Sequence, residues 1–219
     1  MAKQRGNLFG NFDGKLGLAV GSAWKGRPTV REYVPNNNSR TEKQLITRAR
    51  FSRLGKLARA FQRCIDLGFE EVADALRMTC GNVFVKNNWF NVTALTPAEV
   101  TVNYSSLQVA DGLLPAASFG AVDYGTGQHL QVSVTMEGGS DQYGADDNDD
   151  VYLFAYCPDL EQGALSQAAK RSADKVQVNV PSSWDGMTVH LYAFAIGRKA
   201  GLNEGKRSAS SYCGSGEVE

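Results

Sequence analysis

The sequence predicts an α+β fold in which a glycine-rich β-hairpin and an antiparallel pair of helices precede a β-sandwich of immunoglobulin or fibronectin III type. Glycines recur through residues 10–26 between alternating apolar and polar side chains, which is typical of extended strands. Residues 40–85 carry apolar side chains at helical spacing, and from residue 91 onward short β-prone runs alternate with turns. We therefore expect two domains, a basic two-helix unit at residues 1–90 and the sandwich at residues 91–219.

Charge divides the chain, although its formal net charge is zero. Residues 1–63 carry 14 Lys and Arg against 3 acidic residues, and the remainder carries 9 against 20. The two parts therefore have net charges of +11 and −11. This asymmetry indicates an electrostatic partner for one part, either nucleic acid or the opposite part of a neighbouring copy. The alternative is that the two parts neutralise each other within one molecule.

No segment of the sequence predicts secretion or membrane insertion. The N-terminus lacks the apolar run of a signal peptide, and no window approaches the roughly 18 apolar residues of a spanning helix. The four cysteines are scattered without a Cys-x-x-Cys pair, so we expect free thiols. These features predict a chain that is cytoplasmic at synthesis and leaves the cell only inside an assembly such as a virion.

The first expected element is a hairpin that pairs residues 15–24 with residues 29–34, with a turn at residues 25–28. The glycine spacing also occurs in phosphate-binding loops, but the Gly-Lys-Ser/Thr that such a loop requires is missing. Strand bends explain the glycines better. The residues of this ribbon that we expect to contact a partner are Trp24, Lys25, Arg27 and Arg31.

A strongly basic helix is expected next, over about residues 40–67. Ser39 and Glu42 form a capping box at its start. An apolar stripe from Phe51 to Ile65 should face the core, and the cations on the other side are not offset by acidic neighbours. The cations on or beside this basic face are Arg48, Arg53, Lys56, Arg59 and Arg63.

The one-sided charge of this helix leaves three interpretations open. A solvated basic face is common, whereas a phosphate backbone or a carboxylate-rich protein surface would make use of the charge. Groove-reading signatures are absent, so we expect no sequence-specific recognition of nucleic acid. Gly68 should end the helix in the left-handed conformation, and a second helix over residues 70–85 should then pack antiparallel to the first.

Several short strands are expected after residue 91, and an acidic loop at residues 138–150 interrupts them. The loop offers the oxygen ligands that calcium prefers, but it lacks the glycine and the final glutamate of an EF-hand. We expect a solvated loop that is also a docking surface for the basic helix of another copy. Its aspartates are Asp141, Asp146, Asp147, Asp149 and Asp150.

The sequence predicts no catalytic, metal or cofactor site. His129 and His190 lie in or beside expected strands and lack the spacing of metal ligands. Cys157 with a histidine would be a nucleophile pair, but it precedes Pro158 at a strand end and no base is indicated. We therefore expect neither an enzyme nor a small-molecule substrate.

The ribbon and the start of the basic helix contain the series Gly14-Lys15-x-Gly17, Val20-Gly21-Ser22-x-Trp24-Lys25-Gly26, Arg31, Thr41-Glu42-x-Gln44-Leu45 and Arg50-Phe51. This series resembles the G-K-x-G-x-x-x-G-S-x-W-K-G signature of an uncharacterised bacterial domain family that is common in Bacteroidota. The resemblance implies two helices followed by a sandwich-like β region, and it supplies no catalytic residues. The chain has Asn36-Asn37-Asn38-Ser39 where the family has a proline-containing stretch. Bacteriophage structural proteins have similar openings.

These observations predict a non-enzymatic structural or assembly protein, such as a bacteriophage or phage-derived virion component. It would form homo-oligomers or dock on other virion proteins through its basic N-terminal unit. The alternative is a sequence-independent nucleic-acid-binding protein that uses the basic helix face. A third interpretation is a glycan-binding or adhesion module on the sandwich, with Trp89 and Trp184 as contacts.

Overall fold

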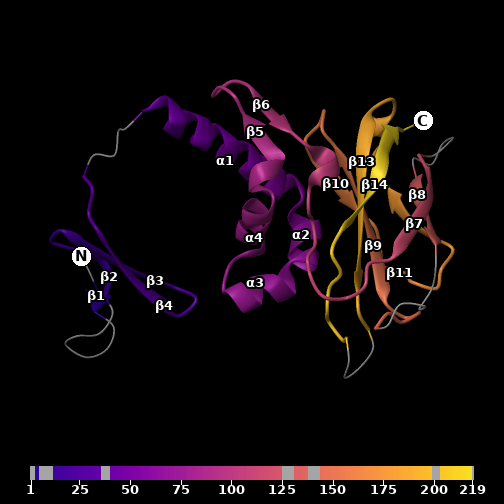
Figure 1. Ribbon diagram of the computed structural model, residues 1–219, viewed down its shortest axis with the longest axis horizontal. Coiled ribbons are helices and arrows are strands. Elements are labelled where there is room, and N and C mark those ends of the chain that lie inside the picture. The colour runs from indigo at the N-terminus through magenta and orange to yellow at the C-terminus, as the bar shows by residue number, and fades with distance from the viewer. Residues whose placement is uncertain are drawn as a thin grey trace. The chain divides into compact units, whose positions relative to one another are not determined.

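In the computed structural model the chain divides into two units, Met1–Gln44 and Leu45–Glu219 (Figure 1). The predicted boundary at residue 90 does not coincide with this division, because the helices share their core with the β-strands that follow them. The structure describes the residues in these ranges: 3–4, 12–35, 40–124, 131–137, 144–198 and 203–218.

The first unit is an antiparallel sheet whose strands are β1 (Lys3–Gln4), β2 (Phe12–Leu16), β3 (Ala19–Trp24) and β4 (Arg27–Glu32). The stretch predicted as one strand at residues 15–24 contains a turn, because Gly17 takes a φ of 60° and reverses the chain. The next turn is tighter than predicted. Lys25 and Gly26 both have positive φ, which is typical of two-residue type I′ hairpin turns, so β4 already begins at Arg27.

Within the described residues 40–124, four helices replace the two that the sequence predicts: α1 (Glu42–Ala60), α2 (Gln62–Gly68), α3 (Glu70–Leu76) and α4 (Cys80–Asn87). Phe61 separates α1 from α2, with φ −90° and ψ 2°. Arg77 ends α3 in the left-handed conformation at φ 53°, and Thr79 begins α4 by accepting a hydrogen bond from the backbone N–H of Asn82 at 3.2 Å. None of the described helices has the length and hydropathy needed to cross a bilayer.

Gly68 does not act as the predicted left-handed stop, because it is the last residue of α2 and is not among the residues with positive φ. Its role is close approach. A Cβ at this position would lie 2.4 Å from the carbonyl oxygen of Val109, so only glycine lets the helix pack this near to the strand-connecting segment. Ser39, the expected capping residue of α1, lies outside the described residues.

Three antiparallel sheets follow the helices (Figure 1). One has the order β10-β9-β13-β14, with β11 also pairing with β9; the second has the order β12-β8-β7, and the third is the hairpin β5-β6. Their strands are β5 (Val92–Ala94), β6 (Val100–Val102), β7 (Ser118–Asp123), β8 (Gln131–Glu137), β9 (Asp150–Cys157), β10 (Gln162–Leu165), β11 (Ala169–Lys170), β12 (Lys175–Asn179), β13 (Thr188–Ile196) and β14 (Ser211–Glu217).

The central strands β9 and β13 are buried on both faces. Alternate residues such as Leu153 and Leu191 share a core with Val176 and Val178 of β12, so two sheets pack face to face. The other face, which includes Phe154, joins the helices in a second core. Figure 1 accordingly shows the helices on one side of β9 and β13 and strands β7 and β8 on the other. The α+β class is confirmed, whereas the immunoglobulin or fibronectin III arrangement stays a prediction.

Phe61 lies at the centre of the core between helices and sheet. Its ring centroid is 4.7 Å from those of Phe154 and Tyr156, 5.6 Å from that of Phe84 and 5.7 Å from that of Tyr192. These distances are in the range in which aromatic pairs attract each other beyond the effect of burial alone. The helices and the central sheet are therefore joined through one fully buried side chain.

Candidate functional site

The strand register of the N-terminal sheet places the predicted contact residues on one face. Trp24 pairs with Arg27, and Arg31 pairs with Val20. Because directly paired residues point to the same side and alternate residues share a face, Trp24, Arg27 and Arg31 lie together. Lys25 lies in the adjoining turn. We call this side of the sheet the basic face.

The opposite side of the same sheet, which we call the apolar face, contains Phe12, Leu16, Ala19, Ala23, Pro28 and Val30, with the exposed Glu32 at the end of β4. The Phe12 ring covers Gly21, where a Cβ would come within 2.8 Å of it. Leu16 and Val30 are 61% and 65% exposed. The sequence pattern predicted strands here, but the turn at Gly17 decides which residues share this face.

Two of the five predicted helix cations are used inside the second unit. Arg53 forms an ion pair with Glu161 and donates a hydrogen bond to the Tyr104 hydroxyl at 3.0 Å. Lys56 lies 3.9 Å from the same Glu161 carboxylate. Burial by itself lowers the pKa of Arg53, but the hydrogen bonds with Tyr104 and Glu161 outweigh it and raise the pKa. Glu161 therefore offsets part of the positive charge of Arg53 and Lys56 within the molecule.

Arg59 and Arg63 differ, because they form no ion pair with any described residue. Both are exposed, and both line a cavity of about 620 Å³ that also includes Asn179 and Pro181. Arg48, the fifth predicted cation, is exposed on α1 outside that lining. The basic helix face therefore divides into an internally paired part and an unpaired part beside a cavity.

The acidic loop is not the solvated loop that the sequence predicted, at least at Asp149 and Asp150. Asp149 is fully buried, and its carboxylate lies 3.3 Å from Arg171 Nε. Asp150 accepts hydrogen bonds from Lys170 at 2.7 Å and from Arg198 at 2.6 Å. These two aspartates connect the start of strand β9 to Lys170, Arg171 and Arg198, so their carboxylates already have partners within the second unit.

The contacts of Asp150 also determine the pKa of its carboxyl group. Burial by itself raises the pKa of Asp150, but the hydrogen bonds from Lys170 and Arg198 outweigh it and hold the pKa below its usual value. Of the remaining loop residues, Asp147 is exposed, Asp146 accepts from the Asn148 backbone N–H at 3.0 Å, and Asp141 lies outside the described residues. No group of three or more metal-ligating side chains occurs among the described residues.

The nucleophile pair that the sequence analysis considered does not form from His190. Cys157 belongs to the core between the two sheets, whereas His190 stacks on Tyr104, with ring centroids 4.5 Å apart, on the helix side. His190 Nδ1 also lies 2.8 Å from the Tyr212 hydroxyl, and burial lowers the pKa of His190. His129 lies outside the described residues.

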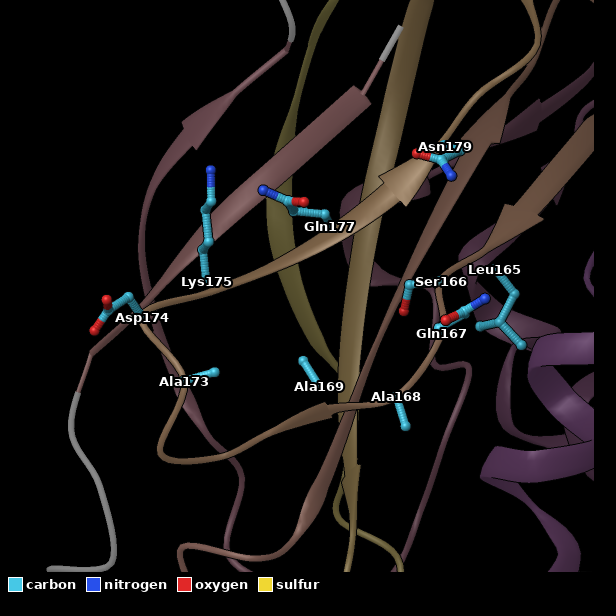
Figure 2. Close-up of a pocket in the computed structure, with 10 residues that line it drawn as sticks. All are labelled: Leu165, Ser166, Gln167, Ala168, Ala169, Ala173, Asp174, Lys175, Gln177 and Asn179. Carbon is cyan, nitrogen blue, oxygen red and sulfur yellow. The ribbon is translucent and has the colours of Figure 1, made fainter. Parts of the chain in front are cut away.

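Sequence analysis missed a second cavity, of about 720 Å³, along strand β12 (Figure 2). Lys175, Gln177 and Asn179 of β12 line one side, and the segment from residue 165 to residue 169 lines the other, as Figure 2 shows. Leu165 and Asn179 also line the cavity beside Arg59 and Arg63, so the two cavities adjoin. We call this continuous depression the edge groove. The alternation of polar and buried residues in β12 is the one sequence signal that marks it.

The sequence profile of a family of unknown function (DUF6266) matches residues 11–214. The matched range includes β2 to β4 of the N-terminal sheet, all four helices and both packed sheets as far as β14. Searches of curated proteins and of solved structures find no match.

Proposed function

We propose that this chain, which belongs to the DUF6266 family, is a non-enzymatic assembly protein that associates with a second copy of itself through the apolar face of its N-terminal sheet. The exposure of that face carries the proposal, because Leu16 and Val30 are 61% and 65% exposed. Among the described residues, the first unit consists of one sheet without a second layer. A sheet with an apolar face buries that face against another element.

A second copy fits this face because an identical face offers the same apolar area and the same small residues. Contact of each apolar face with its equivalent is an isologous, two-fold arrangement, which is the commonest kind of homo-oligomer. Ala19 and Gly21, which pair with Leu16 and Val30, have a small side chain and none, so they leave room for two sheets to approach to about 10 Å. Arg27 and Arg31 then point away from the interface on both copies. Glu32 lies on the apolar side but at the end of β4, where its carboxylate is exposed to solvent.

We further propose that the chain assembles in a virion, of a bacteriophage or of a phage-derived particle, with a sandwich of immunoglobulin or fibronectin III type as its body. Support comes from the resemblance of its opening segment to bacteriophage structural proteins and from the net charges of +11 and −11 on residues 1–63 and on the remainder. Mass spectrometry of purified particles from a host that encodes the chain tests the setting. Absence of the chain from particles, while it is present in the cell, would contradict the virion proposal but not the proposed self-association.

Substitution of one apolar residue tests self-association directly. Val30→Lys places a charge on the apolar face, whereas the control Thr29→Lys places the same charge on the basic face, one residue earlier. Because the interface is two-fold, each dimer contains Val30→Lys twice. Each substitution removes the stabilisation of about 1.5–3 kcal/mol that burial of an apolar side chain provides. We expect the dimer dissociation constant to rise at least about 100-fold for Val30→Lys, measured by size-exclusion chromatography with light scattering.

Salt separates apolar from electrostatic association in the same assay. Apolar association should persist at high ionic strength, because only exposed charge pairs are screened. A wild-type protein that stays monomeric at high concentration in both low and high salt would contradict the proposal. So would equal weakening by Val30→Lys and Thr29→Lys, since that result would show a general effect of charge.

The basic face favours one alternative, sequence-independent binding of nucleic acid. Trp24, Arg27 and Arg31 lie together there, and an aromatic ring among cations is typical of surfaces on which bases stack beside a neutralised backbone. Fluorescence anisotropy with labelled single-stranded DNA tests it. Binding should weaken steeply with salt and should be lost in Arg27→Glu and Arg31→Glu, whereas an absence of binding at low ionic strength removes this function.

A further inference from the structure

We propose that the edge groove of the second unit binds an extended, acidic segment of a partner protein, which adds to β12 as a further strand. This inference concerns a different unit and a different ligand from the proposed self-association. It rests on three observations: an unpaired strand edge, a groove of suitable length and two arginines without an acidic partner.

Among the described strands, β12 lies at the edge of its sheet, and its residues from Lys175 to Val178 have no strand partner on the side away from β8. All five of its residues pair with β8 on one side, and no described strand pairs with it on the other. In an antiparallel pair, alternate residues direct their backbone N–H and C=O groups away from the partner strand. Val176 and Val178 are buried, which fixes the register of the strand, while Gln177 faces the groove. Such an edge is a template for an added strand.

The groove beside this edge has the length of a short peptide. Five residues at about 3.3 Å per residue extend over about 16 Å, and the adjoining cavity beside α1 and α2 lengthens the path. Its opposite wall contains Ala168 and Ala169, whose small side chains leave space above the strand edge (Figure 2). The cavity volumes of about 720 and 620 Å³ are within the range of ligand pockets in proteins.

The charges of the groove select an acidic occupant. Arg59 and Arg63 line the end beside the helices, and neither forms an ion pair with a described residue. The one acidic residue in the lining, Asp174, lies at the other end, next to Lys175. Guanidinium groups bind carboxylates through paired hydrogen bonds, so acidic side chains of an added strand would complete this end of the groove.

The lining disfavours nucleic acid as the occupant. Bases bind on exposed aromatic rings, and the one aromatic residue of the lining, Phe154, is 1% exposed. Its ring belongs to the core around Phe61 instead. Backbone hydrogen-bonding groups along β12, in contrast, are what an extended peptide uses.

Peptide binding to the full chain tests the proposal. The probe is a fluorescein-labelled heptapeptide of alternating glutamate and valine, with capped ends, and binding is followed by fluorescence anisotropy. Its analogue with methylated backbone nitrogens keeps the charges but cannot donate strand hydrogen bonds, so we expect its binding to be lost. Arg59→Glu combined with Arg63→Glu should raise the dissociation constant of the parent peptide at least about tenfold.

Matched controls decide between this groove and other basic surfaces. Lys86→Glu changes an exposed cation of α4 that does not line the groove and should leave binding within about twofold. Val30→Lys should also leave it unchanged, which separates this site from the proposed self-association. Circular dichroism of each variant checks that the fold is kept.

Four results would overturn the proposal. They are an absence of binding up to millimolar peptide, equal binding of the methylated analogue, equal binding of a lysine-valine peptide, and binding that Lys86→Glu weakens as much as the double variant does. A labelled oligothymidine that binds in place of the peptide, with the same dependence on Arg59 and Arg63, would assign the groove to nucleic acid.

Discussion

Replacement of Phe61 by alanine should destabilise the second unit more than any change on its surface. The Phe61 side chain is fully buried and touches four aromatic rings from α4, β9 and β13. Phe→Ala substitutions in such cores cost about 3–5 kcal/mol, since the transfer free energy is lost and a cavity remains. For a unit of this size that loss lowers the melting temperature by about 6–20 °C.

The assay is urea unfolding followed by two probes. Far-UV circular dichroism reports the helices, and fluorescence of Trp184, which is buried between the two sheets, reports the sandwich once Trp24 and Trp89 are changed to phenylalanine. Phe51→Ala is the matched control, because Phe51 is the same residue type on the preceding helix, α1, but is 56% exposed. It should change the free energy of unfolding by less than about 0.5 kcal/mol.

Two results would refute this reasoning. One is a loss below about 1 kcal/mol for Phe61→Ala with an unchanged denaturant slope, which would mean that the core does not depend on this ring. The other is loss of the helical signal at a lower urea concentration than the Trp184 signal. That separation would mean that helices and sandwich unfold independently, as the sequence-predicted boundary at residue 90 implies, and not as one cooperative unit.

Three further predictions use the same unfolding assay. Gly163→Ala should destabilise by about 1–3 kcal/mol, because its Cβ would lie 2.7 Å from the Ala60 carbonyl oxygen, whereas Gly55→Ala, with nothing within 4 Å, should stabilise α1 by up to about 1 kcal/mol. Because ion pairs hold the pKa of folded Asp150 below its unfolded value, its stabilisation is present above about pH 4 and is lost as the pH falls through the folded pKa, so Asp150→Asn should flatten the acid limb. Burial lowers the pKa of His190, so the free energy of unfolding should fall as the pH drops below about 6.5. His190→Phe should remove that fall. The same pH dependence of unfolding between pH 7 and 5.5 in wild type and variant would contradict the prediction.

Local backbone chemistry was largely predictable from the sequence. The turn at Lys25-Gly26 follows from glycine's access to positive φ, and the alternation in β12 correctly indicated one buried face. The helix breaks were not predictable. Phe61 and Arg77 are both residue types that a continuous helix accommodates, so neither position carries a local signal for a break.

The sequence of β9 itself indicates that the strand is buried on both faces. Residues 150–157 form a nearly continuous apolar run, which is typical of strands covered on both sides. Such a run predicts that other elements cover both faces of the strand, as the helices and β12 do. The edge groove had no comparable signal, because its lining comes from segments that are polar or small and lie apart in the chain.

The sequence by itself determined which side chains share a helix or strand face, because the periods of 3.6 and 2 residues belong to the backbone. Only the tertiary structure decided which of them meet an opposite charge. Arg53 reaches Glu161, which lies 108 residues further along the chain. Arg59 and Arg63 lie about two and three turns further along the helical path, form no ion pair with any described residue and line the groove instead. Which loop reaches which helix turn depends on how the helices pack on β9, and that packing is a non-local property.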